Sequence, residues 1–75
     1  MHIELKCYAT LSRYTPPGAD RYELPEGATV GEIMARLGLN PADVKLIFVN
    51  GVKAELDTRL KDGDRLGLFP AVGGG

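Results

Sequence analysis

The residues with the clearest chemical potential are three consecutive glycines at the end of the chain, Gly73, Gly74 and Gly75. The α-carboxylate of Gly75 is expected to be ionised at neutral pH, because the reference pKa of this group is about 3.3–3.7. A carboxylate is a poor electrophile, so acyl chemistry at this position requires prior activation. Glycine lacks Cβ, which allows the tail to enter a narrow slot and leaves the terminal carbonyl accessible from both faces.

Cys7 and His2 are the other residues with chemical potential, and neither has suitable neighbours. Cys7 belongs to the inward-facing set of the first predicted strand, and small buried cysteines are usually unreactive. His2 has no acid or nucleophile at a recognisable catalytic spacing. One cysteine and one histidine cannot supply the ligands of a structural zinc site. We therefore predict no catalytic residue, no metal, no internal disulfide, and a protein that is not itself an enzyme.

The composition is typical of one globular domain. The 75 residues are 44% hydrophobic and 25% charged, and both kinds are mixed along the chain. A formal charge of −1 does not favour nucleic-acid binding. No apolar run approaches the roughly 18 residues that span a bilayer, and the first residues lack the form of a signal peptide. We expect a cytoplasmic protein that binds neither nucleic acid nor membranes.

The first half of the chain predicts two strands and a helix. Strict alternation predicts a half-buried strand over residues 1–11, and a shorter alternating strand is predicted over residues 21–24. Thr29 and Glu32 have the spacing of a capping box, so the helix is expected to begin there. Gly38 is expected to end the helix in the left-handed conformation. An apolar stripe on this helix must face a sheet, and its members are Val30, Ile33, Met34 and Leu37.

The second half predicts further strands and a tail. A nearly continuous apolar strand over residues 44–49 is followed by Asn50-Gly51, a strong signal for a tight turn, and by a short return strand over residues 52–54. A final strand over residues 65–69 ends at a proline. This order predicts an α+β domain over residues 1–69, with four to five strands and one main helix on one sheet face. Residues 70–75 are expected to form a flexible tail.

The whole chain resembles the ubiquitin-like, or β-grasp, superfamily, and within it the MoaD and ThiS families of sulfur carriers. The resemblance rests on the element order, on Leu46-Ile47-Phe48 before a turn, on the turn at residues 60–64, and on the ending at residues 69–75. The ending is similar to that of the small subunit of molybdopterin synthase. It departs from that pattern at Ala71, where a second proline is common, and at Gly73. The resemblance implies a β-grasp fold with a mixed sheet.

A sulfur-carrier function is what the resemblance implies. An E1-like adenylating enzyme would bind ATP and Mg, adenylate the carboxylate of Gly75, and leave a carbonyl that accepts sulfur. A donor of the desulfurase or rhodanese type would supply the sulfur, giving a thiocarboxylate. The acceptor would be the large subunit of molybdopterin synthase or an equivalent enzyme in molybdenum cofactor biosynthesis. The chain itself would bind no cofactor, and Gly73 and Gly74 would let the tail pass into these active sites.

A docking surface on the domain is expected to supply the affinity for such partners. Alternation places Tyr8 on the outer face of the first strand, and Phe69 points outward if its neighbours Leu66 and Leu68 point inward. Exposed apolar clusters of this kind mark partner sites. Ile47 belongs to the surface if Leu46 and Phe48 face the helix. The predicted docking residues are Tyr8, Ile47, Phe69 and Pro70, with ordinary half-exposed or core positions as the alternative.

Other functions remain open from the sequence. The chain could carry sulfur for the thiazole of thiamine, for a tungsten cofactor or for an amino-acid precursor. It could instead be a ubiquitin-like modifier joined through Gly75 to lysines of other proteins. A third reading is a binding-only β-grasp domain whose glycines form a loose end.

Overall fold

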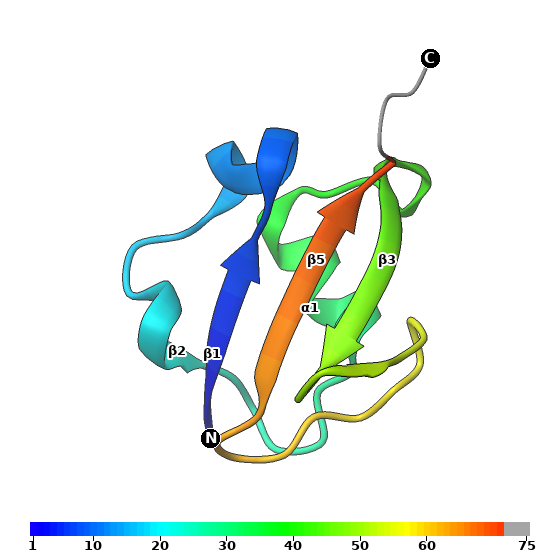
Figure 1. The fold of residues 1–75 in the computed structure, drawn as a ribbon. Helices are drawn as coiled ribbons and strands as arrows, with labels where there is room; N and C mark the ends of the chain where they lie inside the picture. Colours follow the sequence, from blue (N-terminus) through cyan, green and yellow to red (C-terminus); the bar gives the residue numbers. More distant parts are fainter. Residues whose placement is uncertain (72–75) are drawn as a thin grey trace.

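The computed structural model describes residues 1–71, which form a five-stranded sheet with one α-helix packed on one face (Figure 1). The predicted α+β class with one main helix is confirmed. The strands are β1 (His2–Cys7), β2 (Tyr22–Glu23), β3 (Val44–Val49), β4 (Val52–Lys53) and β5 (Arg65–Pro70), and the helix is α1 (Val30–Leu37). Short 3-10 helices lie in two of the connections: η1 (Ala9–Tyr14) and η2 (Ala19–Arg21) between β1 and β2, and η3 (Pro41–Asp43) between α1 and β3.

The sheet is mixed, with the strand order β2-β1-β5-β3-β4. The first and last strands, β1 and β5, lie side by side and run parallel, whereas the other pairs are antiparallel. Cys7 lies opposite Leu68 in this parallel pair, and the amide of Tyr8 donates to the Leu68 carbonyl over 3.0 Å. The carboxyl ends of β1 and β5 are therefore held together at one end of the sheet.

The core lies between α1 and the sheet face that it covers (Figure 1). Alternate residues of β1 and β5 supply the sheet side, as the sequence predicted, and the predicted stripe of α1 supplies the other side. Burying each such side chain contributes about 1.5–3 kcal/mol. The most deeply buried members are Ile3, Leu5, Leu66 and Leu68 from the strands, and Val30, Ile33 and Met34 from α1.

The limits of α1 are set by the signals found in the sequence. The Thr29 hydroxyl accepts a hydrogen bond from the Glu32 amide and donates one to the Glu32 carboxylate, both over 3.2 Å. At the other end Gly38 has φ of 75°, and the Leu39 amide donates to the Met34 carbonyl over 2.9 Å. This is the bond of a Schellman cap. The predicted start and stop of the helix are confirmed.

The two predicted strands before the helix are shorter than expected. β1 ends at Cys7, because the backbone turns at Ala9, where φ is 52°, and η1 follows. Leu11 is still buried, but it enters the core from η1 rather than from a strand. The second strand keeps only Tyr22–Glu23, since Arg21 belongs to η2 and Leu24 lies beyond the strand. The alternation of apolar residues continued to Leu11 in the sequence, although Ala9 is exposed and Leu11 is the one buried residue of η1.

A polar cluster fixes the start of β5 against the turn between β3 and β4. Asn50 and Gly51 both have positive φ, of 54° and 80°, as the predicted tight turn requires. The Asn50 side chain accepts from the Arg65 amide and donates to the Asp64 carboxylate, each over 2.9 Å. The same carboxylate accepts from the Lys61 amide over 2.8 Å. These bonds set the position of β5, and therefore of Phe69 at its far end.

Candidate functional site

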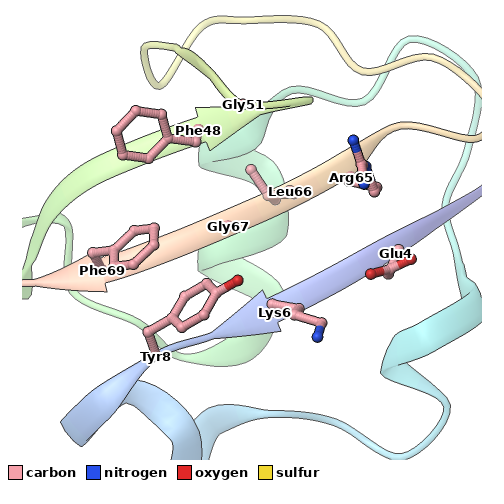
Figure 2. A pocket seen from close by; sticks show the side chains of 9 residues that line it. All are labelled: Glu4, Lys6, Tyr8, Phe48, Gly51, Arg65, Leu66, Gly67 and Phe69. Carbon is pink, nitrogen blue, oxygen red and sulfur yellow. The ribbon is translucent and has the colours of Figure 1, made fainter.

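Three aromatic rings lie together on the outer face of the sheet, opposite α1: Tyr8, Phe48 and Phe69 (Figure 2). We call this set the aromatic surface. The Tyr8 and Phe69 rings are stacked, with centroids 4.2 Å apart and planes at 4°. Phe48 meets Phe69 edge to face, with centroids 5.6 Å apart and planes at 88°. Both are favourable aromatic arrangements. The Tyr8 side chain remains 40% exposed, so the cluster presents apolar area to the surroundings.

Gly67 provides the space that the stacked pair occupies. A Cβ at this position would lie 3.3 Å from Tyr8 Cε2 and 3.5 Å from Phe69 Cε1. Glycine inside a strand weakens the strand, but it permits close approach of neighbouring groups. The sequence interpretation attached no role to Gly67, although an isolated glycine in a strand pattern is a signal for such an approach.

Replacing Gly67 with valine is expected to displace the Tyr8 and Phe69 rings while changing the free energy of unfolding by less than about 1 kcal/mol. The branched side chain enters the volume of the rings, and its high strand propensity offsets the crowding. Proton chemical shifts of the two rings measure the displacement. Arg65→Val, two residues earlier on the same face, is the matched control and should leave these shifts in place. Unchanged ring shifts in Gly67→Val would contradict the role given to the glycine.

The aromatic surface forms one end of an open depression of about 380 Å³ on the same face. Glu4 and Arg65 line the other end, and Lys6 lies between them and Tyr8 (Figure 2). An apolar area beside charged groups is the usual composition of a protein-binding surface. The geometry of this face therefore suits recognition of another protein.

The structure brings two of the predicted docking residues together and leaves one out. Tyr8 and Phe69 are in contact on the outer face, and Pro70 follows as the last, half-buried residue of β5. The expectation that Ile47 is a surface residue is wrong, because this side chain is only 7% exposed. Ile47 lies opposite Leu68 in the β3–β5 register, and paired residues share a sheet face, so both point toward α1.

Phe48 is the member of the aromatic surface that sequence reasoning missed. The apolar run of β3 conceals which residues face the helix, and the expectation placed Phe48 on the wrong side. In the structure Phe48 lies opposite Gly67 of β5 and opposite Lys53 of β4. The register with β5 decides the face, and a single strand sequence does not contain that information.

The predicted tail residues Gly73, Gly74 and Gly75 lie outside the described residues, so their roles stay predictions. Within residues 1–71, no group of three or more His, Cys, Asp or Glu side chains is placed to hold a metal ion. The helices of that same range are too short or too polar to cross a bilayer.

Cys7 is buried at the end of β1. Burial raises the pKa of its thiol above the ordinary value of 9.0, and a hydrogen bond with Thr15 opposes part of this rise. The thiol is consequently neutral at physiological pH, which fits a core position.

Alkylation of Cys7 by iodoacetamide at pH 8 is expected to be at least about tenfold slower in the folded protein than in urea, because burial limits both access and thiolate formation.

The free energy of unfolding is expected to decline as the pH rises past 9.0, because the unfolded chain loses the Cys7 thiol proton before the folded chain does. Urea titrations at pH 8 and pH 10 measure that decline, and Cys7→Ala is the control that should reduce it. Equal alkylation rates in the two states would contradict the buried position.

The fold defined by these elements, a mixed sheet grasping one helix, is the ubiquitin-like β-grasp. A family model described as the ThiS family matches residues 6–75, and the chain belongs to this family. Comparison with curated protein sequences finds no match.

Solved structures agree with this placement. SAMP1, the small archaeal modifier protein 1 of Haloferax volcanii, is 29% identical, with 100% of both chains covered and a TM-score of 0.72. The putative molybdopterin converting factor subunit 1 of Pyrococcus furiosus is 29% identical, with 96% of this chain and 99% of that chain covered and a TM-score of 0.71. A complex of subunits 1 and 2 of the molybdopterin-converting factor of Helicobacter pylori 26695 contains a chain 24% identical, with both chains fully covered and a TM-score of 0.59. The last similarity is one of fold.

Proposed function

We propose that this chain is a sulfur carrier whose Gly75 carboxylate is adenylated by an E1-like enzyme and converted to a thiocarboxylate. The observation that carries the proposal is the ThiS family match, which extends through residue 75 and therefore includes the glycine ending. The aromatic surface supports it, because a carrier must dock on the enzymes that act on its tail. The chain acts as their substrate and contributes no catalytic residue.

The chemistry takes place on the partner enzymes. A carboxylate oxygen of Gly75 attacks the α-phosphorus of ATP, and pyrophosphate leaves. The terminal sulfur of a donor persulfide, of the desulfurase or rhodanese type, then displaces AMP from the acyl-adenylate. A thiol cleaves the resulting sulfur–sulfur bond and releases the thiocarboxylate. ATP and Mg belong to the adenylating enzyme, whereas the chain brings the reacting carbonyl on glycines that have no side chain to obstruct attack.

The length of the tail is compatible with chemistry that takes place in the active site of a partner enzyme. Residues 71–75 span at most about 17 Å when extended, at roughly 3.3–3.6 Å per residue. Ordering them costs about 1–2 kcal/mol per residue, and glycines offer little contact area in return. The affinity must therefore come from the folded domain. Phe69 lies one residue before the end of β5, so docking through the aromatic surface brings a partner next to the start of the tail.

Molybdenum cofactor biosynthesis is the pathway we favour for the sulfur. The similarity at 29% identity to a putative subunit 1 of molybdopterin converting factor supports this choice, as does the Phe69-Pro70 ending. The large subunit of molybdopterin synthase is then the acceptor partner, and the reactions take place in the cytoplasm. A carrier for the thiazole of thiamine is the nearest alternative within the ThiS family.

A second candidate function is protein modification, in which the activated Gly75 is joined to lysines of other proteins. The similarity to SAMP1, whose name describes a modifier, is the observation that favours it. Carrier and modifier share the adenylation step and differ in what attacks the acyl-adenylate.

Mass spectrometry of the intact chain tests the proposal. After incubation with the adenylating enzyme, ATP, Mg and a sulfur donor, the chain should gain the mass of one oxygen-to-sulfur exchange, localised to Gly75 by fragmentation. Adding the large subunit of molybdopterin synthase with its pterin precursor should return the mass to its starting value. Covalent adducts on denaturing gels without the sulfur exchange would instead support modification. Absence of both products with a competent enzyme would refute activation of the tail.

A further inference from the structure

The depression beside the aromatic surface carries mostly positive charge. Lys6 and Arg65 are exposed on its floor, and Lys53 lies opposite Phe48 on the neighbouring strand. Among residues 1–71, Glu4 is the one carboxylate that lines the depression. The whole chain has a formal charge of −1. Glu23, opposite His2 on β2, is a second carboxylate of the outer sheet face, so Lys6, Lys53 and Arg65 leave that face with an excess of one positive charge.

Glu4 and Arg65 are the charged side chains of β1 and β5 that lie farthest from the rings along this depression. The β1–β5 register pairs Glu4 with Arg65 and Lys6 with Gly67, so Glu4 and Arg65 lie toward the amino ends of the two parallel strands, and Lys6 lies between them and the rings. The stacked rings of Tyr8 and Phe69 lie at the carboxyl ends (Figure 2). Residues 65 and 69 are separated by about 13 Å at 3.3 Å per residue. The depression thus has a charged end and an aromatic end, and only the aromatic end adjoins the tail.

We propose that the protein that docks here places apolar side chains over the aromatic surface and carboxylates along Lys6 and Arg65, so that the charges fix its direction on the sheet. This inference rests on the proposed function, because the activating enzyme is the partner considered. An opposite orientation would bring the partner's carboxylates onto Phe69 and its apolar groups onto Arg65, and both contacts are unfavourable. The favoured orientation directs the tail side of the chain toward the partner's active site.

The two ends of the depression have separate kinetic roles. Complementary charges at the edge of an interface act mainly on the association rate and on its dependence on salt. Desolvated aromatic anchors act mainly on the dissociation rate. The charged end therefore governs how fast the complex forms in the correct direction, and the aromatic end governs how long it lasts.

Stopped-flow association with the adenylating enzyme at several salt concentrations tests this inference. The double variant Lys6→Glu/Arg65→Glu is expected to associate about tenfold more slowly at low salt and to lose most of the salt dependence. Glu4→Lys is expected to associate faster than the unmodified chain. Arg36→Glu changes the net charge on α1, which covers the opposite sheet face, and should leave the rate within about twofold. Thermal melting of each variant establishes that the fold is intact, and Lys6→Glu alone is the milder second variant.

The outcomes separate this inference from the proposed function. If the unmodified chain forms the thiocarboxylate but all charge variants associate at its rate, the directed charge contact is wrong and the carrier function stands. The same conclusion follows if Arg36→Glu slows association as much as Lys6→Glu. If slower association appears with Lys6→Glu and faster association with Glu4→Lys, the inference is supported. If the unmodified chain neither binds the enzyme nor gains sulfur, both proposals fail.

Discussion

Removal of Gly74 and Gly75 is expected to abolish thiocarboxylate formation completely while leaving the melting temperature unchanged. The terminal carboxylate then belongs to Gly73 and lies about 7 Å short of the proposed reacting position, at roughly 3.3–3.6 Å per residue. Neither glycine has a side chain to bury, and the core of the described residues is built from side chains between Ile3 and Leu68, so we expect the melting temperature to stay the same. Intact-protein mass spectrometry and thermal melting of the same samples measure the two effects.

Two control variants test whether loading depends on the position of the terminal carboxylate. Ala71→Gly changes the tail without shortening it and should retain sulfur loading. Appending one serine after Gly75 keeps all three glycines but moves the terminal carboxylate away from its proposed position, and it should prevent loading. If the shortened chain still supports cofactor synthesis in cells that lack the natural protein, the binding-only reading is correct and the carrier proposal is wrong.

Phe69→Lys is expected to weaken binding to the adenylating enzyme by about 30-fold or more, which corresponds to at least about 2 kcal/mol for a central aromatic anchor. The substitution removes the ring that contacts both Tyr8 and Phe48, and it places an ammonium group where apolar contact is expected. Phe69 points away from α1, so the free energy of unfolding should fall much less than after loss of a core residue. Calorimetric titration measures binding, and urea titration measures stability.

Val52→Lys is the matched control for this prediction. Val52 is 68% exposed on the edge strand β4, outside the aromatic surface, and its replacement introduces the same group at an apolar exposed position. Binding should be nearly unchanged. Tyr8→Lys should behave like Phe69→Lys, since it removes the other half of the stacked pair. If all three variants bind with the same affinity, the aromatic surface does not contribute to docking.

Local signals in the sequence predicted the helix and the turns well. Thr29, Gly38 and the Asn50-Gly51 pair act through hydrogen bonds and backbone angles within a few residues, and the structure places each as expected. Tyr8 and Phe69 were assigned to the outer face because strict alternation in β1 and β5 shows which residues are buried. The length of the first strand was overestimated because Leu11, which is buried from η1, continues the alternation of β1.

The rest of the site depends on contacts between distant strands. Ile47 and Phe48 exchange faces relative to the expectation, because β3 takes its register from β5, about 20 residues later along the chain. The role of Gly67 also appears only when Tyr8 is placed beside Phe69, and these residues come from opposite ends of the sequence. A single apolar strand carries no information about its partner's register, so neither feature was predictable from local patterns.

The parallel pairing of β1 and β5 places the amino terminus and the start of the tail at opposite ends of the sheet, which determines where a label can be attached. Parallel strands begin at one end of the sheet and finish at the other, so Met1 lies at the end remote from Pro70 (Figure 1). The amino group of Met1 donates to the Leu24 carbonyl over 2.8 Å, a bond that a peptide N–H can also make. A fluorophore, an affinity handle or a solid support joined at Met1 would therefore leave the aromatic surface and the start of the tail unobstructed.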